Sequence, residues 1–574
     1  MSSKWKAAVL ASALMLSSMP SAYAGPKDGQ KWEDAGEGHK IRHVLLLSID
    51  GMHAVDFENC AKGISTIQGG QPYCPNLAEL GEHGVTYLGA SASKPSDSFP
   101  GLTALVTGGS PRATGVFYDA AYDRSLDPPA KMTGNGLLPG PCVAGTPPIG
   151  TRTEYEEGIS IDQNQLNGGA PGGADGGLLS LDPTKMPRDP SKGCAPVYPW
   201  NFLRVNTIFG VIHAAGGYTA WTDKHPAYLS VSGPGDGTNV DDYYAPEINS
   251  PVVPLPVTTV TGTPCSPIPD TSDESDFTRG FKNVQCYDTL KVNATLNQID
   301  GKTHDGKKAA PMPAIFGMNF QAVSVGQKLI EKKGPTGGYV DSIGTPTHSL
   351  LEEIEFVDAA IGQMVSHLKN SGRFDSTLLI VTAKHGQSPI DPKRFFPIPG
   401  PGGNNGQTPG TIIASLLPDS EVNQLGPTED DVSLLWLADS SKTPNAVAML
   451  ETNASSAGIG QIFSGPTLDL LFNTPGLPPN GDPRSPDIIV TPNHGVIYTG
   501  SARKLMEHGG FGHDDTNVMM LVSNPVFETK TITMPVETTQ VAPTILKALG
   551  LDPDSLQAVR KELTPVLPGL DLDE

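Results

Sequence analysis

The sequence predicts an α/β protein with a doubly wound, mostly parallel central sheet, helices on both faces and loop-rich insertions. Three uninterrupted apolar runs support this prediction, at residues 43–49, 314–320 and 377–382. Because none of them alternates polar with apolar residues, each is typical of a strand that is buried on both faces. Segments with helical periodicity separate the runs, as the crossovers between parallel strands require.

The remaining elements follow the same alternation along the chain. Helices are expected over 76–83, 102–106, 206–215, 351–369 and 539–549, and further strands over 85–88, 218–221, 487–490 and 518–522. The helix over 351–369 is the clearest, because its apolar residues recur at helical spacing. Asp223, Lys224 and His225 follow the strand at 218–221; they could line a pocket, but we prefer to interpret them as a polar turn.

Three stretches rich in Gly and Pro interrupt this pattern. They cover about 124–199, 232–311 and 396–480, where the periodicity fades. Such segments are typical of loops and insertions rather than of sheet elements. We therefore expect a single α/β domain over residues 25–574 that carries three insertions.

The N-terminal residues 1–24 have the features of a secretory signal peptide. A basic start precedes an apolar run over 7–19, and small residues before Gly25 form a cleavage site between Ala24 and Gly25. The apolar run is too short to span a membrane as a helix, and no other span is evident. We expect a periplasmic or secreted protein; retention of the segment as an uncleaved anchor is the alternative.

Six cysteines fit an oxidising compartment. Pairing between nearest neighbours would join Cys60 to Cys74, Cys142 to Cys194 and Cys265 to Cys286. Other pairings of six cysteines are equally allowed by the sequence, so the connectivity stays open.

The formal net charge of −22 argues against a partner with a polyanionic backbone. No binding to nucleic-acid polymers is expected. A small phosphate ester in a local pocket remains compatible with this charge, because the pocket and not the net charge decides its binding.

Ser98 lies at the start of a predicted helix, directly before Phe99-Pro100-Gly101. Serine is a preferred N-cap, which is the structural interpretation. The functional interpretation is a nucleophile, because the free N–H groups of a helix start stabilise an alkoxide or phosphate oxygens.

Several predicted strands end in residues that can bind a metal. Asp50 and His385 directly follow strands, Gln321 or Asp341 follows a third, and His508 precedes a fourth. Carboxylate and neutral imidazole suit zinc and other divalent ions. A divalent ion beside a serine would lower the pKa of its hydroxyl and shield the charge of a phosphate ester.

Four motifs, in this order, resemble the core of the alkaline phosphatase superfamily. They are HVLLLSIDGM, SFPGLTALVTGGSPRATGV, LLIVTAKHG and EHGG. The most similar branch is the type I phosphodiesterase/nucleotide pyrophosphatase group. The resemblance covers about half the chain and none of the insertions, and it implies the doubly wound fold predicted above.

The resemblance also implies roles for individual residues. Ser98 would be the nucleophile and form a phosphoseryl intermediate. Asp50, Ser98 and His385 would hold one metal ion, and His508 would hold a second with one or two residues from 321–348. Two zinc-type ions so placed would clamp the attacking and leaving oxygens.

Two single residues depart from the family pattern. Its Asp-His-Gly motif reads Lys384-His385-Gly386 here, and a cation cannot ligate a metal. Its phosphate-holding Asn falls on Asp119, which would repel phosphate when ionised. We expect Lys384 to bind phosphate or pair with an acid, with Asp119 as a candidate partner; two unrelated surface changes are the alternative.

The family's Asp-x-x-Gly-His motif is not intact. One register starts it at Asp341 and leaves Thr345 in place of His, with His348 as a displaced candidate. The other register, which we prefer, puts Asp341 at the His position and Gln321 near the Asp position. Either register predicts that Asp341 lies near the metal.

These residues favour an exported, metal-dependent hydrolase of phosphodiesters or nucleotide-type pyrophosphates. A phosphomonoesterase or phosphonate hydrolase of the same superfamily is the enzymatic alternative. A sulfatase is disfavoured because Cys/Ser-x-Pro-x-Arg is absent at Ser98. A non-catalytic binding protein on a degraded hydrolase scaffold is the alternative from another class, supported by Lys384 and the broken motif.

Overall fold

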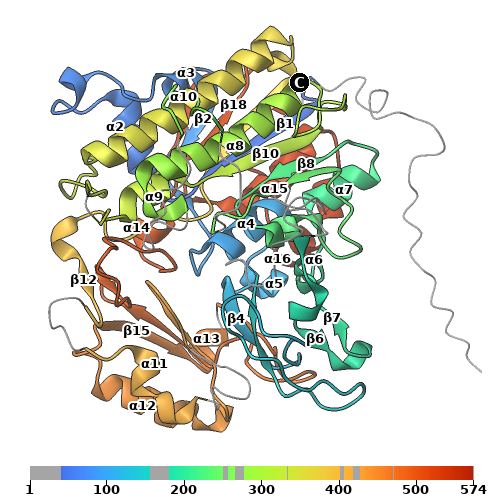
Figure 1. The fold of residues 1–574 in the computed structure, drawn as a ribbon, viewed down its shortest axis with the longest axis vertical. Helices are drawn as coiled ribbons and strands as arrows, with labels where there is room; N and C mark the ends of the chain where they lie inside the picture. The colour runs from blue at the N-terminus through green and yellow to red at the C-terminus, as the bar shows by residue number, and fades with distance from the viewer. Residues whose placement is uncertain are drawn as a thin grey trace, which may run out of the picture.

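The central element of the computed structural model is an eight-stranded sheet with the order β19-β2-β18-β11-β1-β10-β8-β9 (Figure 1). The structure describes residues 40–155, 180–249, 256–265, 277–332, 334–400, 406–417, 427–469 and 471–572. The strands are β1 (His43–Ile49), β2 (Gly84–Tyr87), β8 (Ala220–Thr222), β9 (Asp242–Tyr244), β10 (Ile315–Phe320), β11 (Thr377–Thr382), β18 (Met520–Ser523) and β19 (Lys530–Ile532). Only β18 runs antiparallel to its neighbours, which confirms the mostly parallel sheet.

The three apolar runs form the middle of the sheet, as predicted. Every residue of β1, β10 and β11 is buried. The runs therefore need no alternation, because helices cover both faces of these strands. The central strands are the part of the fold that their own sequence specifies most directly.

The helices form two groups that pack among themselves, on either side of the sheet. One group contains α2 (Ala54–Lys62), α3 (Pro75–Glu82), α8 (Phe281–Ile299), α9 (Ala322–Lys328) and α10 (His348–Asn370). The other contains α4 (Ser98–Thr107), α5 (Pro111–Thr114), α7 (Ile208–Ala214), α15 (Val541–Ala548) and α16 (Gln557–Glu562). Helix α8 lies within the stretch that we expected to be an insertion, but it packs on α10 and β10. Its polar residues and weak periodicity concealed a core helix.

A second, four-stranded antiparallel sheet lies below the central one in Figure 1. Its strands are β13 (Thr428–Glu429), β14 (Ser433–Leu435), β15 (Ile459–Ser464) and β16 (Ile488–Pro492), with α11 (Pro409–Ile412), α12 (Thr443–Thr452) and α13 (Pro466–Asp469) beside them. We expected β16 to return to the central sheet, and this was wrong, because β16 pairs with β14 and β15. An apolar run does not say which sheet it joins.

Short elements complete the described chain. They are β3 (Ala90–Ser91), β4 (Ala120–Asp123), β5 (Thr151–Glu154), β6 (Arg188–Asp189), β7 (Ala195–Pro196), β12 (Phe396–Pro397), β17 (Val496–Ile497), β20 (Val536–Glu537), α6 (Pro199–Phe202) and α14 (His513–Thr516). The predicted signal peptide lies outside the described residues. Within them, no helix has the length and apolar character needed to cross a membrane.

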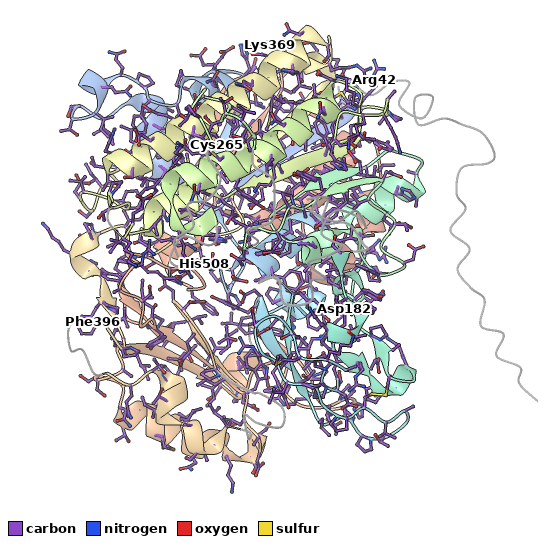
Figure 2. The ribbon with its side chains drawn as sticks, in the orientation of Figure 1. Arg42, Asp182, Cys265, Lys369, Phe396 and His508 are labelled. Carbon is purple, nitrogen blue, oxygen red and sulfur yellow. A yellow bond between two sulfur atoms is a disulfide. The ribbon has the colours of Figure 1, made fainter. Side chains whose placement is uncertain are left out.

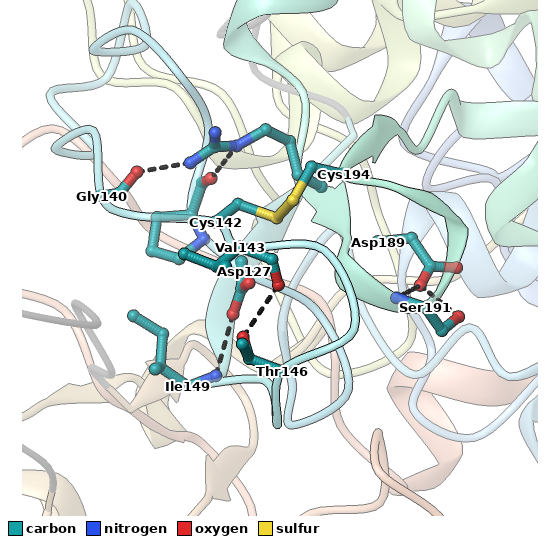
Figure 3. Close-up of a disulfide and its surroundings, with 11 residues drawn as sticks. Asp127, Gly140, Cys142, Val143, Thr146, Ile149, Asp189, Ser191 and Cys194 are labelled. Atoms are coloured by element: carbon teal, nitrogen blue, oxygen red, sulfur yellow. Dashed lines mark hydrogen bonds between the residues drawn. A yellow bond between two sulfur atoms is a disulfide. The ribbon is translucent and has the colours of Figure 1, made fainter.

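The three disulfides join nearest neighbours, as the first pairing predicted. Cys60 bonds Cys74, Cys142 bonds Cys194 and Cys265 bonds Cys286. Figure 3 shows how Cys142–Cys194 ties together two loop segments beside Asp127, which accepts a 2.9 Å hydrogen bond from the Ile149 N–H. Such bridges are typical of proteins that fold in an oxidising compartment.

Candidate active site

The site forms where the carboxyl ends of the parallel strands meet. Ile49 of β1 lies opposite Phe320 of β10, and Ser48 lies opposite Thr382 of β11. This register carries the chain past the strand ends so that Asp50, Gln321 and Lys384 converge. Open α/β sheets place their ligand sites at this edge.

Ser98 is the first residue of α4, but it does not cap that helix. Asp97 is the N-cap, and its Oδ2 accepts a hydrogen bond from the Phe99 N–H at 3.2 Å. The Ser98 hydroxyl therefore remains available for other partners. Gly101 lets α4 approach the strand end, because an added Cβ there would lie 2.3 Å from the Lys384 carbonyl oxygen.

The Ser98 hydroxyl lies between an imidazole and an ammonium group. His385 Nε2 is 3.1 Å from Ser98 Oγ, and Lys224 Nζ donates to the same oxygen at 3.0 Å. His385 Nδ1 is 3.0 Å from the Gly386 carbonyl oxygen, which can only accept. In the neutral imidazole, the proton is therefore on Nδ1, and Nε2 accepts the Ser98 hydroxyl proton.

Asp50 is the centre of a buried group of cations and amide donors. Its Oδ2 lies 3.4 Å from Lys384 Nζ, 3.6 Å from His385 Nε2 and 3.7 Å from Lys224 Nζ. Burial alone would raise the pKa of Asp50, but Lys384, His385 and Lys224 hold that pKa well below its usual value. The carboxylate is therefore ionised and balances the neighbouring cations.

Two side-chain amides complete the surroundings of this carboxylate. Asn319 Nδ2 donates to Asp50 Oδ1 at 2.7 Å, and Gln321 Nε2 donates to Asp50 Oδ2 at 2.6 Å. Gln321 thus lies at the site, as the sequence predicted, but it faces Asp50 with its NH₂ group. In this orientation it acts as a donor to the carboxylate.

Lys384 is completely buried. Besides Asp50, its Nζ lies 3.6 Å from Asp223 Oδ1 and 4.7 Å from the centre of the Tyr228 ring. Our interpretation of Asp223 and Lys224 as a polar turn missed their role. The available signal was their position directly after a strand, the same signal that identified Asp50.

His508 lies where the central sheet meets the smaller sheet (Figure 2). Its ring is 4.1 Å from the ring of His385, and its Nδ1 is 3.4 Å from Asp97 Oδ1. Burial, with smaller contributions from the neighbouring His385 and from Lys328, holds the pKa of His508 well below its usual value. A neutral His508 therefore packs against His385. Its side chain is 13% exposed and that of Lys224 is 9% exposed, so solvent reaches the cluster there.

Two predicted residues lie elsewhere. Asp341 is partly exposed, and its carboxylate accepts hydrogen bonds from the N–H groups of Ile343 and Thr345 in its own turn. His348 lies on the surface at the start of α10, with its Nε2 3.3 Å from Glu352. Both placements near a metal are thereby corrected: the loop after α9 carries these residues away from the strand ends.

Asp119 is also placed differently from our expectation. Lys384 pairs with Asp50 and Asp223, and not with Asp119. The Asp119 backbone N–H donates to Asp97 Oδ2 at 3.0 Å, which holds the segment after α5 against the start of α4. The predicted pairing of Asp119 with Lys384 is therefore corrected, because the carboxylates beside Lys384 are those of Asp50 and Asp223.

A family model described as type I phosphodiesterase / nucleotide pyrophosphatase matches residues 44–153 and 269–515. The chain belongs to this family. Both matched segments contribute residues to the candidate active site. Asp50 and Ser98 lie in the first segment, and Lys384, His385 and His508 lie in the second.

Solved structures to which this chain is similar include murine ectonucleotide pyrophosphatase / phosphodiesterase 5, with 13% identity, 89% of this chain and 95% of that chain covered, and a TM-score of 0.48. An inactive form of the murine protein in complex with AMP has 12% identity, the same coverage and the same TM-score. The human protein has 13% identity, the same coverage and a TM-score of 0.46. No curated protein sequence matches this chain.

The type I phosphodiesterase family generally depends on divalent metal ions, whose usual side-chain ligands are carboxylate, imidazole or thiolate groups. Within the described ranges, no group of three or more His, Cys, Asp or Glu side chains could hold a metal ion. Lys384 stands at the position of the family's Asp, and Gln321 and Asn319 turn donors toward Asp50. Zinc sites need carboxylates, imidazoles or thiolates as ligands, so this donor set does not fit zinc.

Proposed function

We propose that this chain is an exported hydrolase of phosphate esters, acting on phosphodiesters or nucleotide-type pyrophosphates, with Ser98 as its nucleophile. The single observation that carries the proposal is the position of the Ser98 hydroxyl between His385 Nε2 and Lys224 Nζ. An adjacent base and an adjacent cation are the two usual ways to activate a serine. Membership of the family supplies the reaction class.

In the proposed first step, Ser98 Oγ forms a bond to phosphorus while its proton passes to His385 Nε2. The bond from phosphorus to the leaving oxygen breaks, and that oxygen takes a proton from a water molecule. Asp50, 3.6 Å from His385 Nε2, stabilises the imidazolium that forms. Lys224 offers its ammonium group to the charge that develops around the Ser98 oxygen.

In the second step, the hydroxide left by that water attacks the phosphorus of the phosphoserine. The Ser98–phosphorus bond breaks, and Ser98 Oγ takes back the proton from His385 Nε2. Ser98 is thus regenerated, and the net reaction consumes one water. Neither step uses the zinc ions expected from the sequence, because the side chains around Asp50 do not fit them as ligands.

The test compares wild type with Ser98→Ala on bis(4-nitrophenyl) phosphate and on 4-nitrophenyl phosphate. We expect the diester to be the better substrate and Ser98→Ala to lower kcat by about 10³-fold or more. The matched control is Ser96→Ala, because Ser96 is also buried but donates only to the Asp515 carbonyl oxygen. Intact-protein mass spectrometry of a quenched reaction should show a phosphorylated adduct in wild type alone.

Equal rates for wild type and Ser98→Ala would contradict the proposal. Faster hydrolysis of the monoester would select a phosphomonoesterase instead. Lys384, at the position of a family metal ligand, favours one other candidate function, a non-catalytic phosphate-binding protein. Binding of AMP or phosphate without turnover of either ester would select that candidate.

A further inference from the structure

We propose that the ammonium groups of Lys224 and Lys384 replace the divalent metal ions of the family, so that this chain binds the phosphoryl group without metal. The inference deepens the proposed function and rests on the same site. The proposed replacement accounts both for Lys384 at the position of the family's Asp and for the contact between Lys224 and Ser98.

The first argument is position. Both ammonium groups face the same oxygen, Asp50 Oδ2, at 3.4 Å for Lys384 and 3.7 Å for Lys224. His385 Nε2 faces that oxygen as well, at 3.6 Å. A zinc ion bound to Asp50 and His385 would need to lie about 2 Å from each ligand atom. That space borders both ammonium groups, and Lys384 is completely buried and cannot swing into solvent.

The second argument is charge. Asp50 and Asp223 carry two negative charges, and Lys224 and Lys384 carry two positive charges, so these four side chains sum to zero. The nearest buried pair behind them, Lys291 and Asp288, is also neutral as a pair, with 2.9 Å between Nζ and Oδ1. A divalent ion beside Asp50 would be repelled by the two ammonium groups, which already balance Asp50 and Asp223. A metal centre normally supplies the opposite, an excess of carboxylates.

The third argument is the direction of the donors. Asn319 and Gln321 donate N–H groups to Asp50, which occupies lone pairs that a metal would use. Lys384 Nζ lies 3.4 Å from Asp50 Oδ2 and 3.6 Å from Asp223 Oδ1 but, among the described residues, makes no hydrogen bond to either carboxylate. Its buried N–H groups are therefore free to donate to an anionic oxygen.

The experiment measures metal content and phosphate binding separately from turnover. Wild type is incubated with Zn²⁺, Mg²⁺ and Mn²⁺, desalted and analysed by elemental mass spectrometry. Inorganic phosphate and AMP are then titrated calorimetrically into chelator-treated protein. The variants are Lys384→Met, Lys224→Met and Lys224→Arg, with Lys369→Met as the control because Lys369 pairs with Glu79 on the surface.

We expect clearly less than one metal ion per chain and phosphate binding that survives the chelator. Lys224→Met and Lys384→Met should weaken phosphate binding by about 10- to 100-fold, the range for a lost charged hydrogen bond. Lys224→Arg should recover part of the loss and Lys369→Met should match wild type. If Lys384→Met fails to fold by circular dichroism, the partly exposed Lys224 still decides the result.

Retention of one or more zinc ions per chain, with phosphate binding lost on chelation and restored by zinc, would overturn the inference. Unchanged phosphate affinity in Lys224→Met would do the same. The proposed function fails differently, by turnover that does not depend on Ser98. Phosphate binding that needs the two lysines but no metal, without Ser98-dependent turnover, would support the inference and contradict the proposed enzymatic function.

Discussion

Replacing Asp50 by Asn tests whether one carboxylate balances the buried cations of this site. The substitution keeps the shape of the side chain and removes its charge. Lys384 Nζ lies 3.4 Å from Asp50 Oδ2, and at an effective dielectric constant of about 20 this pair contributes about 5 kcal/mol of Coulomb attraction. Breaking a buried pair from one side costs about 3–5 kcal/mol, so we expect Asp50→Asn to lower the free energy of unfolding by that amount.

The assay is a double-mutant cycle by urea unfolding of the oxidised protein, followed by circular dichroism and tryptophan fluorescence. Lys384→Met removes the partner charge and shortens the side chain by only one heavy atom. We expect the double variant to be about 1–3 kcal/mol more stable than the sum of the single effects predicts. A cycle with Lys369→Met in place of Lys384→Met should be additive, because Lys369 lies on the surface beside Glu79. Additivity within about 0.5 kcal/mol for Asp50 and Lys384 would refute the pairing.

Three further substitutions test the start of helix α4, its close approach to Lys384 and the pH dependence of stability. Gly101→Ala should destabilise the protein by about 1–3 kcal/mol and impair turnover, because its Cβ would meet the Lys384 carbonyl oxygen at 2.3 Å; Gly500→Ala is the control, and equal unfolding midpoints would contradict the close approach. Asp97→Ala should cost at least about 1 kcal/mol in unfolding experiments, because it removes the α4 cap and the hydrogen bond from the Asp119 N–H, and an unchanged midpoint would show that neither bond contributes. Burial, aided by nearby arginines, lowers the pKa of His43 from 6.5 to about 4, so its contribution is complete above pH 6.5 and about 3 kcal/mol is lost as pH falls to 4. His43→Gln should flatten that part of the stability profile, and an unchanged slope would contradict this assignment.

The sequence predicted the central sheet because its strands carry their own signal. Residues 43–49, 314–320 and 377–382 are mostly apolar without a polar–apolar alternation, which is typical of a strand buried on both faces. The run at 488–492 is equally apolar, but it belongs to the second sheet. The apolar composition of a strand predicts that it is buried but does not predict which strand it pairs with. Only the structure therefore shows which sheet each strand belongs to.

The same distinction applies to the site. Asp50 and Gln321 directly follow β1 and β10, and His385 lies three residues after the end of β11, so these residues were predictable from strand ends that meet by register. Asp341 was placed wrongly because the loop between α9 and α10 has no register to constrain it. Both Asp97 and Ser98 are preferred caps, and only the observed bond from the Phe99 N–H decides between them.

Lys224 and Lys384 show where a motif comparison loses chemical information. When each position is considered alone, Lys384 is interpreted as the loss of a metal ligand and Lys224 as part of a polar turn. In space, the two ammonium groups face one carboxylate oxygen, and one of them donates to the Ser98 hydroxyl. A cation fixed by carboxylates can stabilise the same developing phosphate charge as a metal ion, although it carries one charge instead of two. In the proposed site, Lys384 is therefore better understood together with Lys224, as a source of positive charge for the phosphoryl group, than as an isolated loss of a metal ligand.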